Sequence, residues 1–371
     1  MSIVEVTTKR QQQDFLALPH TIYKNDPNWI CPLEAEISAI FNPQQNSFFS
    51  HGTCTRWVLY QENRCIGRIA AFINFKKAEK ESAGGAGFFE CIDNQEAANL
   101  LFDTARAWLQ QQGVQAMDAP VNFGENDKYW GLLVDGFKPP SLGMNYNPPY
   151  YIGLFENYGF RKNYDQFTNF LDATTPMPER FTRISDWIMQ KPQYSFKHFN
   201  RKEFDRFARD FQEIYNDAWI DFDHFTPIDM GSIKDSFRQM EAIMDEKIIW
   251  FAYHDNEPIA FVLCLPDVNQ LLKHVNGKLD LWGKLKFLWY KKTTTMDRLR
   301  IIIMGCKQKF RNHGVESALI RCLQNEVLPR KTIKGVELAW VGDYNEKMMS
   351  IHKATGAVKD KVHRTYRIEF R

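Results

Sequence analysis

One junction between an apolar strand and a helix constrains the fold of this chain more than any other segment. Residues 301–306 form an apolar run rich in isoleucine, which predicts a buried strand. A short basic loop with Arg311 and Gly314 follows, and residues 315–320 have the spacing of an amphipathic helix. Because the first N–H groups of a helix lack partners and its dipole is positive there, the junction predicts an anion site.

A second unit of the same kind follows, with a strand at residues 335–341 and a helix at residues 345–357. Together the two units resemble the GNAT superfamily of acyl-CoA-dependent N-acyltransferases. Arg311 and Gly314 match its pyrophosphate loop, written Arg/Gln-x-x-Gly-x-Gly/Ala. Glu316 stands in place of the last small residue, so either its side chain turns outward to solvent or the site no longer binds coenzyme A.

The second signature of the superfamily is an Asn after a strand and then a helix that ends Tyr-x-Lys-x-Gly-Phe. Asn345 and Gly356 match it, whereas His352 takes the Tyr position and Ala357 the Phe position. The resemblance covers roughly residues 195–371 and implies the fold and an acyl-transfer activity.

The first half of the chain repeats this order of strands and helices and ends a helix with Gly159. Residues 91–96 stand where its pyrophosphate loop would be, but they contain no glycine and two acids, which would repel a diphosphate. We therefore predict a degenerate GNAT-like domain at residues 1–172, a linker and bridging helix at 173–194, and a GNAT-like acyltransferase domain at 195–371. The predicted class is α/β (α+β), and each domain has a mixed, mainly antiparallel twisted sheet flanked by helices.

Composition excludes several classes of function. Lys and Arg number 47 against 45 Asp and Glu, so no bulk charge favours nucleic acid, and an aminoacyl-tRNA-dependent transferase of the Fem type is disfavoured. The seven cysteines are scattered without a Cys-x-x-Cys pair, so we expect neither a disulfide framework nor a metal site. No signal peptide or membrane-spanning run is visible, which predicts a cytoplasmic protein.

The resemblance implies a role for each residue near the junction. The main chain at residues 304–306 would lie beside the thioester, the N–H groups of residues 312–317 would surround the pyrophosphate, and Asn345 would align the pantetheine arm. The co-substrate would be acetyl-CoA or a longer acyl-CoA. The residues assigned to it are Met304, Gly305, Cys306, Arg311, Asn312, His313, Gly314, Val315, Glu316, Ser317 and Asn345.

Acyl transfer to an amine also requires proton movement. By position His352 would protonate the departing thiolate, since an ordinary histidine titrates near neutral pH. Asp343 and Glu337 are the nearest candidate bases. A surface histidine and ordinary solvated or capping carboxylates are the alternatives that remain open.

Two segments are candidates for binding the amine acceptor. Trp219, Asp221 and Asp223 lie where the superfamily shapes its substrate loop. In the first domain, residues 122–126 and 144–151 alternate Asn with aromatic residues and suggest a pocket that faces the second domain. The residues taken from the latter segment are Tyr146, Asn147 and Tyr150. An ordinary loop and a structural turn at the domain interface are the alternatives.

An insertion at residues 266–298 replaces what is usually a short turn. Within it, residues 279–292 predict a basic helix with one apolar face. Contact with a membrane surface or an acyl chain is one interpretation, and packing on the neighbouring domain is the other. The apolar face consists of Leu281, Trp282, Leu285, Leu288 and Trp289.

The leading hypothesis is an acyl-CoA-dependent N-acyltransferase that acts on a small-molecule amine whose identity the sequence does not reveal. The alternative is a non-catalytic protein of the same fold that binds a lipid or small metabolite between its domains. The oligomeric state is not predicted.

Overall fold

The computed structural model describes residues 1–220, 227–241 and 243–370. In the first half of the chain the elements are β1 (Ser2–Glu5), α1 (Lys9–Ile22), α2 (Glu34–Ile40), η1 (Ser47–Ser50), β2 (Gly52–Gln61), β3 (Arg64–Asn74), α3 (Phe75–Glu81), β4 (Ala83–Cys91), α4 (Gln95–Gln111), β5 (Ala116–Ala119), β6 (Leu132–Asp135), α5 (Tyr151–Tyr158) and β7 (Arg161–Asp172).

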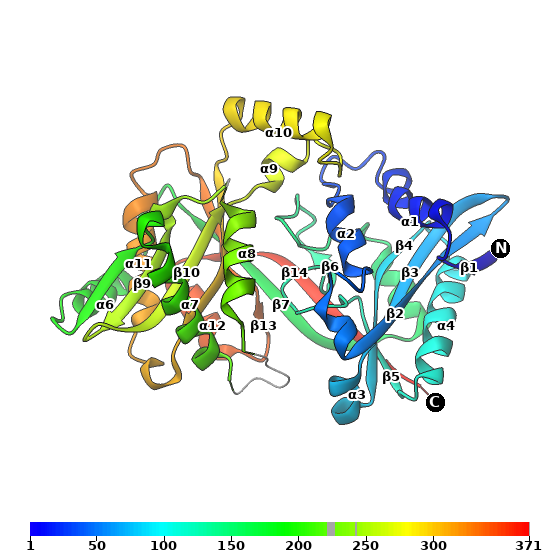
Figure 1. The fold of residues 1–371 in the computed structure, drawn as a ribbon, viewed down its shortest axis with the longest axis horizontal. Helices are drawn as coiled ribbons and strands as arrows, with labels where there is room; N and C mark the ends of the chain where they lie inside the picture. The colour runs from blue at the N-terminus through cyan, green and yellow to red at the C-terminus, as the bar shows by residue number, and fades with distance from the viewer. Residues whose placement is uncertain (221–226, 242, 371) are drawn as a thin grey trace.

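In the second half they are α6 (Glu179–Met189), β8 (Tyr194–His198), η2 (Arg201–Glu203), α7 (Phe204–Ala218), α8 (Met230–Met240), η3 (Glu246–Ile248), β9 (Ile249–His254), β10 (Glu257–Pro266), α9 (Asn269–Leu272), α10 (Leu281–Thr293), β11 (Arg298–Cys306), η4 (Gln308–Phe310), α11 (Val315–Val327), β12 (Gly335–Glu337), β13 (Val341–Gly342), α12 (Glu346–Ala354) and β14 (Val358–Glu369). Figure 1 shows the two halves side by side.

The described strands form one twisted sheet in the order β1-β2-β3-β4-β5-β14-β7-β12-β11-β10-β9-β8, with β13 beside β7 and β6 beside β14. Within that sheet β4–β5 and β11–β12 are the parallel pairs, and the other pairings are antiparallel. Helices flank the sheet in both halves. This mixed, mainly antiparallel architecture confirms the predicted fold class.

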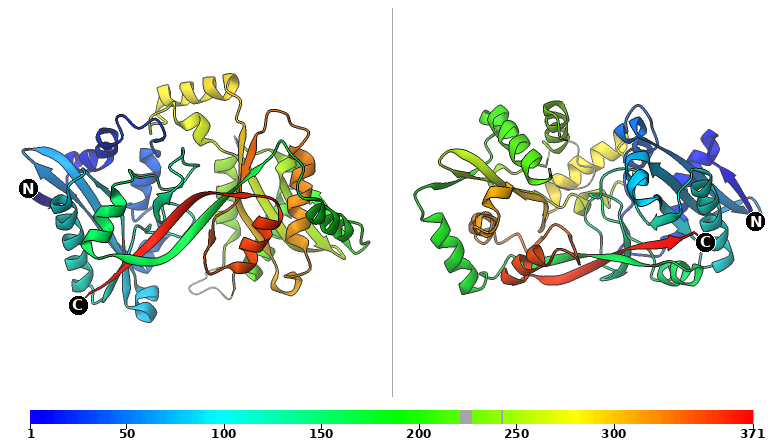
Figure 2. Two further views of the ribbon diagram at one scale, coloured as in Figure 1. Left: turned by 180° about the vertical axis from the view of Figure 1, so that it is seen from behind. Right: turned by 90° about the horizontal axis from the view of Figure 1, so that it is seen from below.

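Two long strands are shared between the halves. β14, the last strand of the second half, pairs with β5 of the first half from Tyr366↔Ala119 to Glu369↔Ala116. β7, the last strand of the first half, pairs with β12 of the second half from Gly335↔Asp172 to Glu337↔Phe170. Figure 2 shows β7 and β14 running side by side through the middle of the molecule. The halves are therefore joined by backbone hydrogen bonds as well as by the linker.

The insertion lies above the space between the halves (Figure 1). Its first part packs on the first half: Val268, Leu272 and Val275 cluster with Leu33 and Leu142. The Asn269 amide also donates to the Pro140 carbonyl oxygen over 2.8 Å. In the described part of the chain, no helix is both long and apolar enough to span a bilayer.

Candidate functional site

The strands β11 and β12 separate at the predicted junction. They are paired only at Arg298↔Gly335, Leu299↔Val336 and Arg300↔Glu337. Beyond this point the chain after β12 turns to β7, where the Leu338 N–H donates to the Asn169 carbonyl oxygen over 2.9 Å. β11 continues along β10 to Cys306. One backbone edge of β11 from residue 301 onward thus borders a gap, and Met304, Gly305 and Cys306 lie on this part of the strand.

A bulge accompanies the separation. The register between β10 and β11 shifts between Leu263 and Cys264, which leaves Ile302 without a partner. The Ile302 side chain is exposed, although it sits in the middle of a strand. Since a bulge bends a strand away from its neighbour, it accounts for part of the opening between β11 and β12.

The N-terminus of α11 follows β11 and carries an unusual cap. Its N-cap is Gly314 at φ +79°, a left-handed conformation that favours glycine, and no side chain in the described chain caps the helix. The N–H groups of the first turn, from Val315 to Ser317, therefore lack the side-chain oxygen that usually satisfies one of them. Such a terminus binds anions well.

The wall of the gap on the β11 side is aromatic. Trp219 lies at the C-terminal end of α7 and stacks on Tyr215, with the ring centroids 4.7 Å apart. Its ring also covers Gly305 so closely that a Cβ there would lie 2.7 Å from it. The position of Gly305 is therefore explained by close approach of Trp219.

A loop from the first half reaches both walls of this gap. On the β12 side, the Trp340 indole N–H donates to the Asn126 carbonyl oxygen over 3.2 Å. The Asn126 amide donates to the Tyr164 hydroxyl over 3.2 Å, which ties the loop to β7. On the other side the charges of Glu125 and Asp127 add to burial in raising the pKa of Tyr215 on α7.

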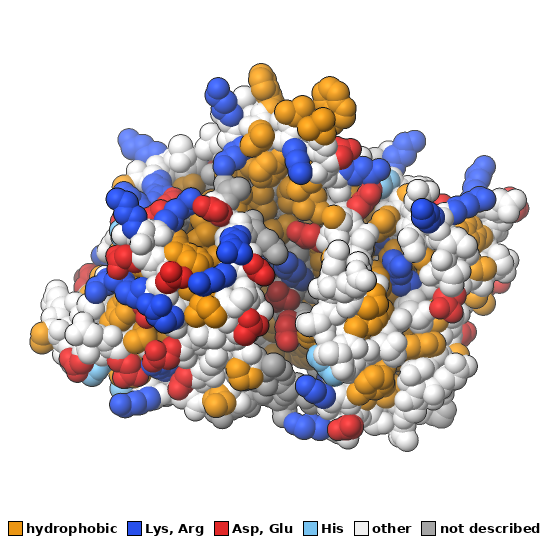
Figure 3. Space-filling model, viewed as in Figure 1, with side chains coloured by type: hydrophobic (Ala, Val, Ile, Leu, Met, Phe, Trp, Pro, Cys, Tyr) orange, Lys and Arg blue, Asp and Glu red, His pale blue; other side chains and the backbone are white. Residues whose placement is uncertain are grey.

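Glu125 and Asp127 form a pair of carboxylates in this loop. Both side chains are reached by solvent, yet burial is the main cause that raises the pKa of each. Solvent therefore reaches both carboxylates although neighbouring protein surrounds part of each. Figure 3 shows a hollow between the halves with acidic side chains inside it. Carboxylates with raised pKa values in a cleft are candidates for binding or deprotonating an amine.

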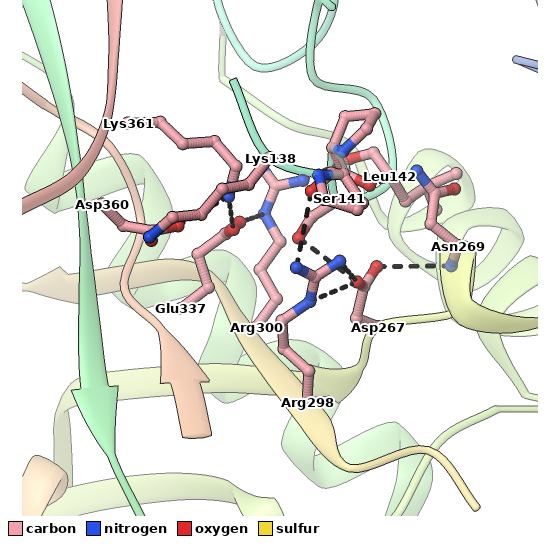
Figure 4. A network of polar contacts seen from close by, with 12 residues as sticks. Lys138, Ser141, Leu142, Asp267, Asn269, Arg298, Arg300, Glu337, Asp360 and Lys361 are labelled. Carbon is pink, nitrogen blue, oxygen red and sulfur yellow. Dashed lines mark hydrogen bonds and ion pairs between the residues drawn. The ribbon is translucent and has the colours of Figure 1, made fainter. Parts of the chain in front are cut away.

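An ion-pair network joins the two halves at the start of β11 and β12 (Figure 4). Asp267 is fully buried and lies 2.5 Å from the Arg298 guanidinium, and it accepts a hydrogen bond from Ser141 of the first half over 3.3 Å. Arg300 donates to the Leu142 carbonyl oxygen, also in the first half. The arrangement fixes β11 relative to the first half, and with it the loop that carries Glu125 and Asp127.

No family model matches the chain. It is 29% identical over 376 residues to "Bacterial ceramide synthase" of Caulobacter vibrioides, an alignment that covers 99% of this chain and 97% of that protein. It is 27% identical over 366 residues to "Protein YghO" of Escherichia coli, covering 96% and 93%.

Two solved structures show the fold. A tandem GNAT protein from the clavulanic acid biosynthesis pathway matches with a TM-score of 0.56 at 11% identity, over 99% of this chain and 98% of that one. A GCN5-related N-acetyltransferase from Sphaerobacter thermophilus matches with a TM-score of 0.53 at 10% identity, over 100% and 96%. The chain has the tandem GNAT fold. The resemblance drawn from the two sequence signatures is therefore confirmed at the level of the fold.

Two residues of the GNAT pyrophosphate loop lie differently from expectation. The Arg311 guanidinium donates to the Ala218 carbonyl oxygen, so it holds the loop against the end of α7. The Glu316 side chain does not turn outward: it is buried, with one carboxylate oxygen 3.9 Å from the Lys347 Nζ. A diphosphate at this site would therefore rely on backbone N–H groups, beside a carboxylate that Lys347 partly balances.

The group at the GNAT tyrosine position is buried as well. The His352 Nδ1 lies 2.9 Å from the Asn169 amide nitrogen, and burial lowers the pKa of His352 to about 4. Because an amide nitrogen donates, Nδ1 accepts and the proton resides on Nε2. The expectation that His352 titrates near neutral pH is wrong, since the ring is neutral there.

Neither predicted base is free. Glu337 is fully buried, 2.9 Å from the Lys361 Nζ and 3.5 Å from the Arg300 Nε. Burial alone would raise its pKa, but Lys361 and Arg300 outweigh burial and lower it. Asp343 lies 2.8 Å from the Lys162 Nζ. Both carboxylates thus form ion pairs with neighbouring strands, Glu337 within the interdomain network.

Other predicted residues serve local structure. Asn345 caps α12 by accepting from the Met348 N–H over 3.1 Å. Tyr146 donates to Asp26 over 2.7 Å, Asn147 accepts from the Leu133 N–H over 2.7 Å, and Tyr150 donates to the Cys91 carbonyl oxygen over 2.7 Å. Asp221 and Asp223 lie outside the described residues. Asn312 and His313 are exposed in the loop before α11.

The sequence pointed to residues 122–126 but missed their role. Glu125 belongs to that segment and Asp127 follows it directly. Nothing in the local pattern distinguishes these acids from those of a solvated loop. Only the contacts with Trp340 and the charge effect on Tyr215 place them opposite the second half.

Proposed function

We propose that this protein transfers an acyl group from acyl-CoA to the primary amine of a long-chain amino alcohol of the sphingoid-base class. One juxtaposition carries the proposal: the open edge of β11 and the uncapped start of α11 border the gap that the carboxylates of Glu125 and Asp127 face from the first half. The charges of Glu125 and Asp127 act on Tyr215, whose ring stacks on Trp219, and Trp219 in turn lies over Gly305.

The donor side fits the backbone of the second half. The first N–H groups of α11 would hold the diphosphate of coenzyme A, and main-chain N–H groups of β11 would meet the oxyanion that forms on the acyl carbon. The thioester supplies an activated acyl group. The buried Glu316 next to Lys347 makes this site less cationic than a loop with a small residue there.

The acceptor side fits the first half. A protonated amine would bind to Glu125 and Asp127, and one carboxylate would take its proton before the nitrogen attacks the acyl carbon. As the carbon–sulfur bond breaks, the nitrogen loses a second proton and the departing thiolate takes up one, so that one proton in total passes from the carboxylate to solvent. A carboxylate with a raised pKa is suited to this exchange because it holds the proton more readily than an ordinary one.

Two observations support a long-chain amine. The relative from Caulobacter is named a ceramide synthase, and a ceramide is an N-acylated sphingoid base. Figure 3 shows hydrophobic side chains gathered in the upper part of the hollow, under α10. Beneath the helix, Val268, Leu272 and Val275 form a buried apolar cluster with Leu142 and Phe287 packed against it. An alkyl chain could lie along the hydrophobic side chains of the hollow while its ammonium group meets the carboxylates.

The experiment is to incubate the full-length protein with palmitoyl-CoA and sphinganine and to measure both free thiol and the N-acyl product by mass spectrometry. We expect the two products in equal amounts. Hexylamine in place of sphinganine serves as a short-chain control and should react far more slowly. Binding of palmitoyl-CoA without product from any long-chain amine would contradict the proposed acceptor.

The non-catalytic alternative is favoured by the buried Glu316 in place of a small residue and by the neutral His352 in place of tyrosine. It is also favoured by Arg311, whose guanidinium is engaged with the Ala218 carbonyl oxygen. Calorimetry with coenzyme A and with sphinganine separates the two functions. Binding of sphinganine without any binding of coenzyme A would favour a lipid-binding protein over a transferase.

A further inference from the structure

Helix α10 carries a continuous apolar face that no part of the described chain covers. Fourteen large apolar side chains are exposed in the structure, and six of them lie between residues 279 and 289. They are Leu279 (37% exposed), Leu281 (73%), Trp282 (72%), Leu285 (51%), Leu288 (59%) and Trp289 (66%). So dense a cluster of exposed leucine and tryptophan marks an interaction surface.

The opposite face of α10 is already used for packing. Gly283 is buried, and a Cβ there would lie 1.9 Å from the Lys278 carbonyl oxygen. Phe287 packs on the cluster of the insertion, and the Tyr290 ring stacks on His274 at 3.7 Å. Asp280 caps the start of the helix by accepting from the Gly283 N–H over 2.8 Å. The helix therefore has a fixed orientation, and its exposed face is not a surface left by loose docking.

Lysines surround the apolar face. At 100° per residue, Lys284 and Lys286 fall on opposite sides of it, and the helix contains no acidic residue. Lys291 and Lys292 are exposed at its C-terminal end. The neighbouring Arg201 and Arg238 are ion-paired, Arg201 with Glu241 and Glu246 and Arg238 with Asp235. The local excess of positive charge therefore comes from the lysines of α10 itself, in a chain with 47 basic and 45 acidic side chains.

We propose that α10 is a peripheral membrane-binding helix that lies in the interface of an anionic bilayer, with Trp282 and Trp289 among the acyl chains. An apolar face with tryptophan, bordered by lysine, is the pattern of helices that lie in this interface, where the ammonium groups meet lipid phosphates. Figure 1 shows α10 as the outermost ridge of the molecule, which suits a flat partner rather than a groove.

The position of α10 suggests how membrane docking could serve the proposed reaction. The helix lies above the hollow between the halves, so a bilayer against its exposed apolar face would lie close to the apolar upper part of that hollow (Figures 1 and 3). A long-chain amine could then pass from the membrane to Glu125 and Asp127. This delivery rests on the proposed function, whereas docking of α10 does not.

Flotation with vesicles tests the docking. The full-length protein is mixed with vesicles of phosphatidylcholine alone or with about one third phosphatidylglycerol, at low salt. The variant is Trp282→Ser with Trp289→Ser. The matched control is Trp187→Ser, which removes a tryptophan that is 60% exposed on α6. We expect the wild type and the control to float with anionic vesicles and the double variant to bind at least about tenfold more weakly.

Activity separates failure of docking from failure of the proposed function. With substrates in detergent micelles the double variant should match the wild type, and with sphinganine embedded in vesicles it should be slower. The proposal is overturned if the wild type does not float with anionic vesicles, or if the double variant floats as well as the control. It is also overturned if sedimentation shows that α10 instead joins two copies of the chain.

Discussion

The junctions β4–α4 and β11–α11 have the same construction in the two halves, but the gap beside the strand is closed at the first and open at the second. Both parallel pairs extend over three residue pairs, and both neighbouring ladders contain a register shift. In the first half, however, the gap is closed: the Val121 N–H donates to the Ala86 carbonyl oxygen over 2.8 Å. Tyr150 donates to the Cys91 carbonyl oxygen, and Tyr151 accepts from the Cys91 N–H.

The helices that follow the two junctions also differ, because only the helix of the first half has a side-chain cap at its N-terminus. Asn94 caps α4 by accepting from the Ala97 N–H over 2.8 Å, whereas Gly314 leaves α11 without a side-chain cap. In the first half the chain satisfies its own backbone groups, so little remains for a ligand. The same scaffold is therefore closed by a few side chains in one half and kept open by a glycine in the other, and the closed half contributes to the cleft through its loops.

Asp127→Asn should have the largest effect on activity. If Asp127 binds and deprotonates the amine, we expect the rate of acyl transfer to fall by about 100-fold or more. Binding of palmitoyl-CoA should be unchanged. Glu96→Gln, at the start of α4 in the closed half, is the matched control and should retain full activity. Equal loss in both variants would contradict the assignment of the acceptor site to the loop.

The pH profile sharpens the same prediction. The pKa values of Asp127 and Glu125 are raised by burial, so the carboxylates lose charge at a higher pH than free carboxyl groups do. Activity should therefore decline as the pH falls through those raised values. A midpoint at about 3.9, the value of an unperturbed aspartate, would count against a base with a raised pKa.

The second prediction concerns the equivalent helices α12 and α5. His352 stands where Phe155 stands in the first half, and both are buried. The folded pKa of His352 is about 4, below the ordinary value of 6.5, so the unfolded chain binds the extra proton between these values. Stability from this group is present above pH 6.5 and is lost as the pH falls toward 4, by up to about 3 kcal/mol.

Urea unfolding of the wild type and His352→Phe at pH 7 and at pH 4.5 measures this loss. The variant should lose less free energy of unfolding than the wild type over the same range. The free energy of unfolding of the variant should still depend on pH to some extent, because burial also lowers the pKa of His363 to about 4. Identical pH dependence in the two proteins would mean that His352 is protonated in the folded state.

Gly314→Glu tests the open junction itself. A carboxylate at the N-cap would occupy the anion site, and we expect coenzyme A affinity to fall by about 100-fold. Gly314→Ala is the necessary control, because any Cβ there meets Ile188 at 2.4 Å and the backbone has φ +79°. The loss beyond that of Gly314→Ala, measured by calorimetry, isolates the charge. If Gly314→Glu loses no more coenzyme A affinity than Gly314→Ala, the diphosphate does not bind at this helix terminus.

Asn94→Ala should have the smallest effect and concerns the closed junction. Removing this cap should lower the free energy of unfolding by about 1 kcal/mol, measured by urea titration. Coenzyme A affinity and activity should not change, because the first half is closed to the donor. A change in affinity would show that the two junctions are coupled.

Much of the scaffold could be predicted from local pattern. The apolar run before Arg311, the helix after Gly314 and the glycine at residue 356 identified the junctions, because periodicity and helix caps are local properties. The apolar face at residues 279–292 was identified for the same reason. The roles of Gly305 and Ser317 beside a bound thioester and diphosphate remain predictions.

The environment of charged residues could not be predicted in this way. The sequence left two alternatives for Glu316, an outward side chain or loss of coenzyme A binding, and it predicted that His352 titrates near neutral pH, but both side chains are buried. Their neighbours, Lys347 and Asn169, lie 31 residues ahead and 183 residues back in the chain. The burial and the pKa of a side chain depend on such distant contacts, which the neighbouring residues in the sequence do not reveal.

The order of the elements, the glycine at the start of α11 and the lysine-bordered face of α10 can be inferred from the sequence, because each follows from neighbouring residues. Three features depend on the folded chain: β14 pairs with the first half, β7 pairs with the second, and the loop of Glu125 and Asp127 reaches Trp340 through Asn126. Strand pairing and cleft formation join residues far apart in the chain, through backbone groups that every residue shares, so no local pattern encodes them.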